Sequence, residues 1–355
     1  MPCYKLAHLL PECIQSILAQ TYKDFEILVM DDASPDDTPR IAQSFSDPRV
    51  KHIRNDPNLG HLKNYNKGIQ LAQGEYIWLI SADDRLRSPS VLERYVQLMD
   101  SHPKIGYVFC RGVGLENGGE TGIVKWGDCG DQNAIWHGKE FLISLLESNR
   151  VIAASGMVRK ECYEKVTLFP LDLPYAGDWY LWCVFAFHYD VGYLAEPMVC
   201  YRLHELSMTN TLSRRHRIED NLSVRWRMKR LAQGSGETKL IQKCLDSLAR
   251  HYTFCVVSGA FDASGYSLTQ TEFEESLQKN AESDKEHRRI LAWVFAGLGD
   301  GFYRQGDLVK ANHYYRLSIK QDISKPRILM KCVKVRIGGL GMLLSRARVL
   351  LRGAK

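Results

Sequence analysis

The chain has 355 residues, a formal net charge of +6 at pH 7 and 45% hydrophobic residues, which suits one α/β domain followed by a helical appendage. Its ten cysteines are scattered without Cys-x-x-Cys spacing, so the sequence indicates neither a zinc site nor a disulfide framework, and a reducing cytosol suits it. No apolar stretch reaches the length of a membrane-spanning helix, and we expect no signal peptide.

The first part of the chain predicts helices and strands in alternation. An apolar strand at 25–30 runs into the acidic stretch Asp31-Asp-Ala-Ser-Pro-Asp-Asp-Thr38. A strand followed by Asp-Asp-x-Ser and a helix predicts a turn that can receive a nucleotide base and ribose. The other elements predicted here are a helix over 9–20, a helix beginning near Thr38, a strand over 49–53, a turn at 58–60 and a helix over 61–73.

A second apolar strand, predicted over 76–80, also ends in acids, at Asp83 and Asp84. In open α/β sheets ligands bind outside the carboxyl ends of the strands. Two adjacent carboxylates repel each other unless a cation lies between them and a phosphorylated group, which is the usual role of such a pair with Mg²⁺. The alternative is that Ser81 or Asp83 caps the helix predicted to begin near Pro89.

The next hundred residues continue the α/β pattern as far as Asp178, which begins a further helix. That position favours either a general base or an N-cap for the helix. Trp179 and Trp182 could stack on sugar rings, although aromatic residues at this spacing more often belong to a core. The elements predicted here are a helix over 91–101, a strand over 105–110, a glycine-rich loop over 112–130, helices over 138–147 and 179–189, and a strand over 192–196.

These motifs, taken in order, resemble the family 2 glycosyltransferases of the GT-A fold. The resemblance rests on residues 7–38, on Asn58-x-Gly60 and on Gly74-Glu-Tyr-Ile-Trp-Leu-Ile-Ser-Ala-Asp-Asp84, and it covers roughly residues 1–210. It implies a mixed α/β sheet flanked by helices. It also implies transfer of a sugar, with inversion, from a UDP- or dTDP-linked donor to a glycan or lipid-linked saccharide.

The resemblance also implies roles for individual residues. Asp32 would contact the base with Asp31 supporting it, and Asp83 would ligate Mg²⁺ or Mn²⁺ on the donor diphosphate with Asp84 beside it. Asp178 would be the general base. The other residues expected to bind the nucleotide sugar are Tyr4, Asn66, Lys67, Arg202 and His204.

The sequence departs from the family pattern at three places. Ser81 stands at the first position of the usual Asp-x-Asp motif, and Gly177 replaces a Glu before Asp178. Met1-Pro-Cys-Tyr4 resembles only the end of the family's first strand, which points to a truncated chain or a misassigned start.

Arg202 and His204 could neutralise a departing diphosphate, and His204 could instead ligate the metal. The alternative is that Arg202 and His204 are ordinary polar residues on the protein surface.

Beyond residue 212 the pattern becomes helical. We expect a helical region over 213–323, with basic residues at 214–232, a helix over 238–258 and one tetratricopeptide-like helix pair near 285–320 that packs or docks a partner. Residues 324–355 contain many Lys and Arg among apolar residues and no Asp or Glu. This tail suits either an anionic membrane surface or packing on the protein with a solvated basic face, and it carries no nucleic-acid-binding motif.

The sequence therefore predicts a cytoplasmic glycosyltransferase in which a divalent cation assists donor binding, with possible peripheral contact at the inner membrane face. One rival is a scaffold protein that keeps the fold but has lost turnover, which Ser81, Gly177 and the short first strand would suit. The other is a sugar nucleotidyltransferase, which usually carries a glycine-rich, basic amino-terminal loop that this sequence lacks.

Overall fold

The protein is described by a computed structural model that covers residues 1–116, 118–203, 207, 211–260 and 269–322. The chain divides into two compact units, Met1–Leu212 and Ser213–Lys355. The first unit combines strands and helices, and the described part of the second consists of helices.

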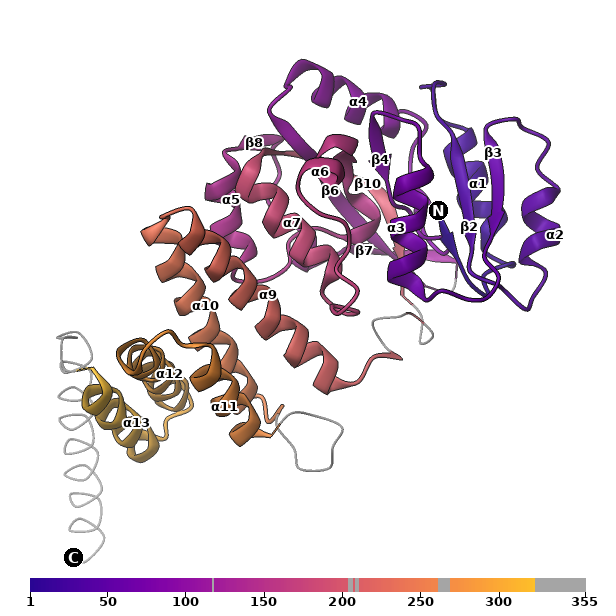
Figure 1. The fold of residues 1–355 in the computed structure, drawn as a ribbon. Helices are drawn as coiled ribbons and strands as arrows, with labels where there is room; N and C mark the ends of the chain where they lie inside the picture. The colour runs from indigo at the N-terminus through magenta and orange to yellow at the C-terminus, as the bar shows by residue number, and fades with distance from the viewer. Residues whose placement is uncertain (117, 204–206, 208–210, 261–268, 323–355) are drawn as a thin grey trace, which may run out of the picture. The chain divides into compact units, whose positions relative to one another are not determined.

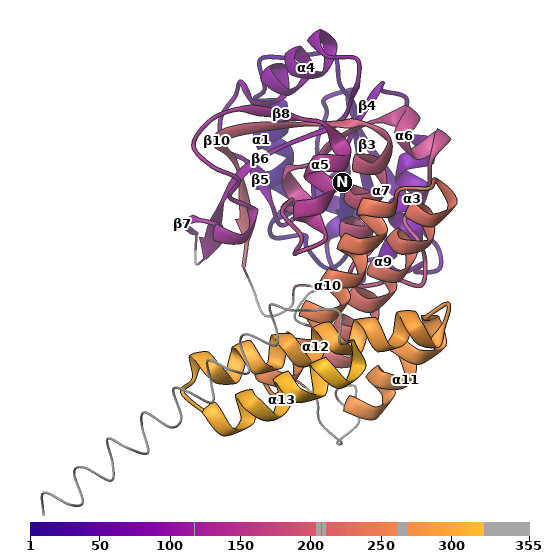
Figure 2. The same cartoon turned by 90° about the vertical axis from the view of Figure 1, so that its left-hand side faces the viewer.

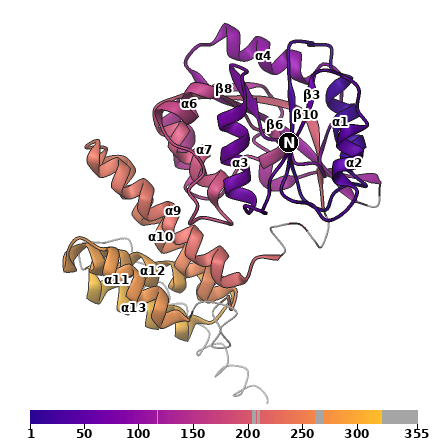
Figure 3. The ribbon, with the colours of Figure 1, turned by 45° about the vertical axis from the view of Figure 1, so that its right-hand side comes forward.

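The first unit begins with a small parallel sheet in the order β1-β2-β3. All five residues of β2 are buried, as expected for a central strand in a parallel sheet. In Figure 3 α3 lies on one side of these strands and α1 and α2 on the other. The elements are β1 (Pro2–Cys3), α1 (Leu10–Leu18), β2 (Ile27–Asp31), α2 (Thr38–Gln43), β3 (Val50–Arg54) and α3 (His61–Leu71).

A second, mixed sheet forms the rest of the unit, in the order β4-β9-β6-β10-β5, with β7 paired to β6 and β8 to β10. The strands β6 and β10 run parallel along most of their length, whereas the other neighbours are antiparallel. The strands are β4 (Tyr76–Trp78), β5 (Arg85–Leu86), β6 (Ile105–Glu116), β7 (Gly119–Ile123), β8 (Ala134–Trp136), β9 (Met157–Arg159) and β10 (Asp190–Arg202). The helices are α4 (Val91–Ser101), α5 (Gly138–Leu145), α6 (Lys160–Lys165) and α7 (Gly177–His188), and short 3-10 turns occupy Lys125–Gly127 and Ala153–Ser155.

Apolar side chains from α4 and from the strands form the main core beneath the second sheet. Within it Trp78 stacks on Tyr95 with ring centroids 4.3 Å apart, and the Tyr95 hydroxyl donates to the Ser155 carbonyl (2.9 Å). This polar contact satisfies a hydroxyl that burial would otherwise penalise. The core thus fixes the strand β4 that leads to Asp83 and Asp84.

The expected α/β architecture with a helical carboxyl-terminal region is confirmed, and two details differ. The prediction of a loop over 112–130 is wrong in its first part, because β6 continues to Glu116 and forms a hairpin with β7. Glycines at 112, 114, 119 and 122 obscured the strand pattern there. The strand expected over 192–196 is the middle of the longer β10, which pairs with β6.

The second unit contains five described helices, with one large apolar core among α9 to α12 and a smaller cluster around Ala311 and Tyr315 of α13. Two of these helices, α12 and α13, lie side by side in Figure 2. The Tyr315 hydroxyl donates to Asp300 (2.6 Å), and Phe302 stacks on Tyr314 with centroids 5.4 Å apart. The helices are α9 (Arg214–Gly234), α10 (Thr238–Val257), α11 (Gln270–Asn280), α12 (Asp284–Arg304) and α13 (Leu308–Gln321).

Two predicted features lie outside the described residues, namely the basic tail over 324–355 and His204. Among the helices that the structure does describe, none has the length and apolar character required to cross a membrane.

Candidate active site

Asp31 ends β2 and is fully buried. Its carboxylate accepts hydrogen bonds from the Ser34 amide (2.8 Å) and from Arg54 Nη1 (2.7 Å), and His52 Nε2 lies 3.2 Å from it. Burial alone would raise the pKa of Asp31, but the hydrogen bonds from Ser34, His52 and Arg54 outweigh it and lower that pKa. Asp31 is therefore a buried anion that holds the acidic turn after β2 in place.

Asp32 is also buried and binds the turn at 58–60. Its two oxygens accept from the amides of Leu59 (2.8 Å) and Gly60 (2.9 Å), and Asn58 Nδ2 donates to its carbonyl oxygen (2.5 Å). Gly60 has a φ of +80°, a conformation that glycine adopts without a steric penalty. The Asn-x-Gly motif thus forms a clamp on Asp32.

Asn55 joins this cluster from the end of β3. Its side-chain amide donates both to Asp32 (2.9 Å) and to Asn64 (2.8 Å), and its oxygen accepts from Lys67 Nζ (2.7 Å). The side chain of Asn55 therefore links Lys67 to Asp32. Asn66 points elsewhere, since its side chain bonds the backbone of Phe169 with both its amide and its oxygen.

Asp83 and Asp84 follow β4, and both are tied to the end of β10. The Arg202 amide donates to Asp84 Oδ1 (2.9 Å), and Arg202 Nε donates to the Asp83 carbonyl (2.8 Å). Arg202 also pairs with Glu12 on α1 (2.6 Å), which in turn contacts Arg85 (3.2 Å). The guanidinium of Arg202 thus links three segments that are far apart in the sequence.

The pair Asp83 and Asp84 is electrostatically strained. Burial of Asp84 and the adjacent charge of Asp83 raise the pKa of Asp84 well above its ordinary value, against the opposing effect of Arg202. Neither Ser81 nor Asp83 caps α4, whose N-cap residue is Ser90. The capping alternative from the sequence is therefore wrong for both residues.

Asp178 lies in the first turn of α7, where the N-cap residue is Ala176 rather than Asp178. Its carboxylate accepts from the Trp179 amide (2.7 Å) and from Asn149 Nδ2 (3.2 Å). Burial raises the pKa of Asp178 to about 6, and these two hydrogen bonds only partly oppose the shift. A carboxylate with a pKa close to neutrality is suited to accept a proton in a reaction.

Tyr65 on α3 shows that the acids of β4 and α7 converge. Burial raises the pKa of its hydroxyl, and the charges of Asp83, Asp178 and Asp84 raise it further. Its ring packs edge-on against Phe169, with centroids 5.4 Å apart, so its position is fixed. Three carboxylates that are separated by up to 95 positions in the sequence therefore lie close enough to the Tyr65 hydroxyl for their charges to raise its pKa.

Sequence reasoning missed Tyr65, Asn55 and Asn149. Asn55 follows the predicted strand 49–53, so its place at a strand end was a usable signal. Tyr65 and Asn149 gave no such signal, because only the packing of α3 and of the segment after α5 against distant parts of the chain directs their side chains.

Other predicted or considered residues lie at the edge of the site or in the core. Tyr4, which follows β1, is 45% exposed, with Lys5 Nζ 5.1 Å from its ring centre. Trp179 and Trp182 are both buried, and Trp179 donates to the Leu145 carbonyl (2.9 Å), so they belong to the core.

The carboxylates at 83 and 84 fit a divalent cation that also binds substrate phosphates. Mg²⁺ commonly takes one or two carboxylates and completes its coordination with phosphates and water. Within the described ranges, no three His, Cys, Asp or Glu side chains gather into a metal site. A cation here would thus depend on ligands from the substrate, and it would favour the ionised form of Asp84.

Comparison with known sequences shows which proteins the first unit is similar to. The model for glycosyl transferase family 2 matches residues 1–167. An uncharacterised glycosyltransferase of Rickettsia typhi is 31% identical over 215 residues, which are 59% of this chain and 65% of that protein. One of Haemophilus influenzae is 31% identical over 213 residues, 57% of this chain and 63% of that protein. The chain thus spans just under two thirds of the length of these relatives.

Among solved structures, the crystal structure of Staphylococcus aureus TarS residues 1–349 superposes with a TM-score of 0.61. The match covers 90% of this chain and 89% of that one at 16% sequence identity, so it bears on the fold alone. The fold is of the GT-A type. With the family match at residues 1–167 and acids gathered at the strand ends, the first unit is similar to glycosyl transferase family 2.

Proposed function

We propose that the protein transfers a sugar from a nucleotide diphosphate sugar to an acceptor hydroxyl, with inversion at the anomeric carbon. The observation that carries the proposal is that the charges of Asp83, Asp84 and Asp178 all raise the pKa of the Tyr65 hydroxyl. The first two acids can hold a diphosphate through a cation, and the third can take up a proton.

In this proposal the nucleotide binds along the carboxyl ends of β2 and β3. Asp32 accepts a hydrogen bond from the base, which is uracil or thymine. Its Oδ1 already accepts from Asn55 and Leu59, but Oδ2 accepts only from the Gly60 amide among these and can take a second hydrogen bond. Asp31 and Lys67 support this part of the site, and the exposed ring of Tyr4 lies at its edge.

The diphosphate lies beside Asp83 and Asp84. A bound Mg²⁺ or Mn²⁺ would neutralise the charge of the phosphates there. Arg202 holds the backbone of Asp83 and the side chain of Asp84 in a fixed position through two hydrogen bonds. This rigid support favours a site that is already organised before the donor arrives.

Asp178 acts as the general base. Its carboxylate takes the proton of the acceptor hydroxyl as that oxygen attacks the anomeric carbon and the bond to the diphosphate breaks. Asn149 and the Trp179 amide fix the orientation of the carboxylate. The acceptor in this proposal is a glycan or lipid-linked saccharide, and the activity is placed on the cytoplasmic side of the cell envelope.

The substitution Asp178→Asn tests the assignment of the base. We expect nucleotide affinity to persist and sugar transfer to fall by roughly 10²–10⁴-fold, because a positioned base contributes about that factor. The assay measures nucleotide diphosphate release from a panel of UDP- and dTDP-sugars with simple glycoside acceptors. Asp172→Asn, at an exposed position on the preceding loop, is the matched control. Near-normal transfer by Asp178→Asn would remove Asp178 from the mechanism.

A further inference from the structure

Glu12, in the first turn of α1, forms ion pairs with two arginines that adjoin the acid pair Asp83 and Asp84. Its carboxylate oxygens lie 2.6 Å from Arg202 Nη2 and 3.2 Å from Arg85 Nε. Arg85 directly follows Asp84 in the sequence, and Arg202 ends β10. A single carboxylate therefore engages both guanidinium groups beside the acid pair.

The helix α1 is docked on the turn that carries the acid pair, and this fixes the place of Glu12. Cys13 Sγ donates to the Ser81 carbonyl (3.4 Å), and the Leu86 amide donates to Ser16 Oγ (3.1 Å). The helix thus holds both ends of the turn. The positive end of its dipole also favours a negative charge in the first turn, where Glu12 lies.

Arg202 requires a negatively charged partner, because its side chain is only 12% exposed. A guanidinium stays charged in proteins, and a buried charge without a partner is costly. The Arg202 amide donates to Asp84 Oδ1 and its Nε donates to the Asp83 carbonyl, so the acid pair lies beside it. Across the described ranges, however, Arg202 and Arg85 form their ion pairs with glutamates and not with the acid pair.

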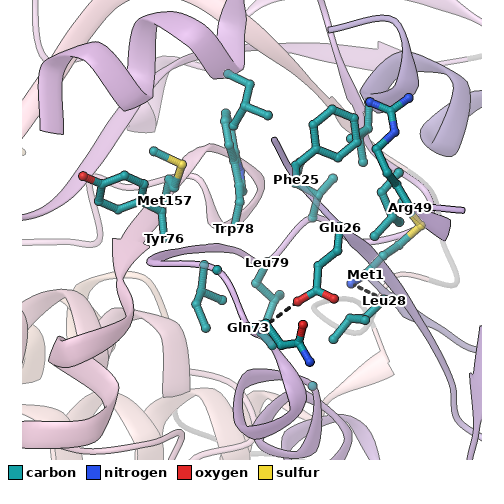
Figure 4. Close-up of a pocket in the computed structure, with 18 of the residues that line it drawn as sticks. Met1, Phe25, Glu26, Leu28, Arg49, Gln73, Tyr76, Trp78, Leu79 and Met157 are labelled. Carbon is teal, nitrogen blue, oxygen red and sulfur yellow. Dashed lines mark hydrogen bonds between the residues drawn. The ribbon is translucent and has the colours of Figure 1, made fainter. Parts of the chain in front are cut away.

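A cavity of about 710 Å³ in the first unit offers these guanidinium groups no other outlet. Figure 4 shows Trp78 and Phe25 among its walls, and neither of the two arginines lines it. Without the charge of Glu12, the acid pair is therefore in place to receive them.

Arginines and a divalent cation would compete for the same two carboxylates. Mg²⁺ commonly takes one or two carboxylates and fills its other positions with phosphate oxygens and water. An arginine that pairs with a carboxylate can occupy both of its oxygens. Ser81 brings no charge to this turn, so loss of either carboxylate to an arginine would leave a cation with a single one.

We propose that Glu12 is a positioning residue that makes this site depend on a divalent cation. By pairing with Arg202 and Arg85, it keeps their guanidinium groups off the Asp83 and Asp84 carboxylates and reserves these for Mg²⁺ or Mn²⁺. Without Glu12, the guanidinium groups pair with the carboxylates and take over the neutralising role of the cation. The inference rests on the proposed function, since it takes the acid pair to be the place where a cation holds a nucleotide diphosphate.

The substitution Glu12→Gln in the full chain tests this proposal. Glutamine keeps the shape of a side chain that is 47% exposed and removes only its charge, so the fold should persist. Electron paramagnetic resonance measures free Mn²⁺ in titrations without nucleotide, and calorimetry measures UDP affinity with and without Mn²⁺. We expect the Mn²⁺ dissociation constant to rise by about tenfold or more, and the gain in UDP affinity that Mn²⁺ provides to shrink by a similar factor. An unchanged Mn²⁺ affinity would overturn the proposal.

Glu120→Gln is the matched control for a general effect of charge. Glu120 is also partly exposed, and its ion pairs are with Arg87 (3.0 Å) and, less closely, with Arg85 (3.8 Å). We expect its substitution to change Mn²⁺ affinity by less than about threefold. Equal losses in the two variants would show a general effect of charge and overturn the assignment of Glu12.

A second substitution asks whether a freed arginine displaces the cation. Arg85→Gln in the Glu12→Gln chain should restore Mn²⁺ affinity by about threefold or more, because one competing guanidinium group is gone. No recovery would contradict the mechanism. If the natural chain binds neither Mn²⁺ nor UDP, the proposed function itself fails. If it binds both and Glu12→Gln behaves like the natural chain, only this inference fails.

Discussion

Asp178 is an acid whose pKa differs from that of an ordinary surface acid. Burial raises its pKa to about 6, whereas hydrogen bonds lower the pKa of Asp31 in the same unit. Two carboxylates of one site thus differ in their readiness to accept a proton, and that difference supports separate roles as base and as structural anion.

The pH dependence of stability tests this environment without any substrate. A folded-state pKa raised above the unfolded value means that the folded protein binds the extra proton between about pH 4 and pH 6, so this contribution weakens stability as pH rises through that window. We expect Asp178→Asn to be more stable than the natural chain at pH 8 by on the order of 2 kcal/mol, and nearly equal to it at pH 4.

Denaturant titrations at the two pH values measure the effect. Asp37→Asn is the control of opposite sign, because the bond from Arg40 lowers the pKa of the exposed Asp37 and removal of that charge cannot stabilise the protein at pH 8. A destabilised Asp178→Asn at pH 8 would contradict the account of this residue.

The rate of sugar transfer should also depend on the ionisation of Asp178. It should rise with pH, whereas the contribution of Asp178 to stability falls. Only the ionised carboxylate can take a proton, so kcat/KM should rise with pH and level off above an apparent pKa near 6. The measurement is a pH–rate profile between pH 5 and pH 8 at fixed metal concentration. A flat profile across that range would exclude Asp178 as the essential base.

At the scale of elements, close packing between α5 and α7 fixes the end of the helix whose first turn carries Asp178. Gly138 begins α5, and a Cβ atom there would lie 1.8 Å from the Tyr189 carbonyl oxygen and 2.2 Å from that of Ala186. Both obstacles are backbone atoms at the end of α7, which cannot move aside without displacing the helix.

Gly138→Ala should therefore lower the free energy of unfolding by about 3 kcal/mol or more, as severe overpacking does. Gly177→Ala is a matched control, because Gly177 begins α7 and its Cβ would meet only side-chain atoms of Phe169 (3.3 Å) and Leu62 (3.4 Å). We expect it to change stability by less than about 1 kcal/mol. Thermal and denaturant unfolding compare the two, and equal losses would contradict this packing argument.

Most helices and strands of this chain can be predicted from the sequence, because the residue patterns that specify them lie within a few neighbouring positions. The apolar strands before Asp31 and Asp83, and the helix after Asn58-x-Gly60, were predicted within a few residues of their observed bounds. The helix α11 was missed although Thr269 and Glu272 form a capping box, a signature that can be read in sequence. Strands β5 and β8 have only two and three residues, and their pairing with β10 depends on tertiary contacts that no local pattern encodes.

The residues of the candidate site likewise divide into those that can be predicted from the sequence and those that cannot. Asp31, Asp32, Asp83 and Asp84 could be predicted because each pair follows an apolar strand. Tyr65, Glu12 and Asn149 could not, since the folding of distant segments brings them to the acids.

At the scale of the whole molecule, β1 joins the two acidic turns of the candidate site. The carbonyls of Pro2 and Cys3 bind the amides of Ala82 and Asp32, which lead to the two acidic turns. The second unit has its own core, and the buried Lys229 is paired with Glu286 (2.9 Å) within it.

The central claim is that the acids at the strand ends form a metal-dependent site for a nucleotide diphosphate. Calorimetric titration of the purified chain with UDP and dTDP, each with and without Mn²⁺ or Mg²⁺, tests it most directly. We expect binding that requires the cation, is abolished by Asp83→Ala and is kept by Asp24→Ala, whose exposed side chain lies before the opposite end of β2. Absence of binding by the folded chain, or cation-dependent binding that survives Asp83→Ala, would contradict the claim.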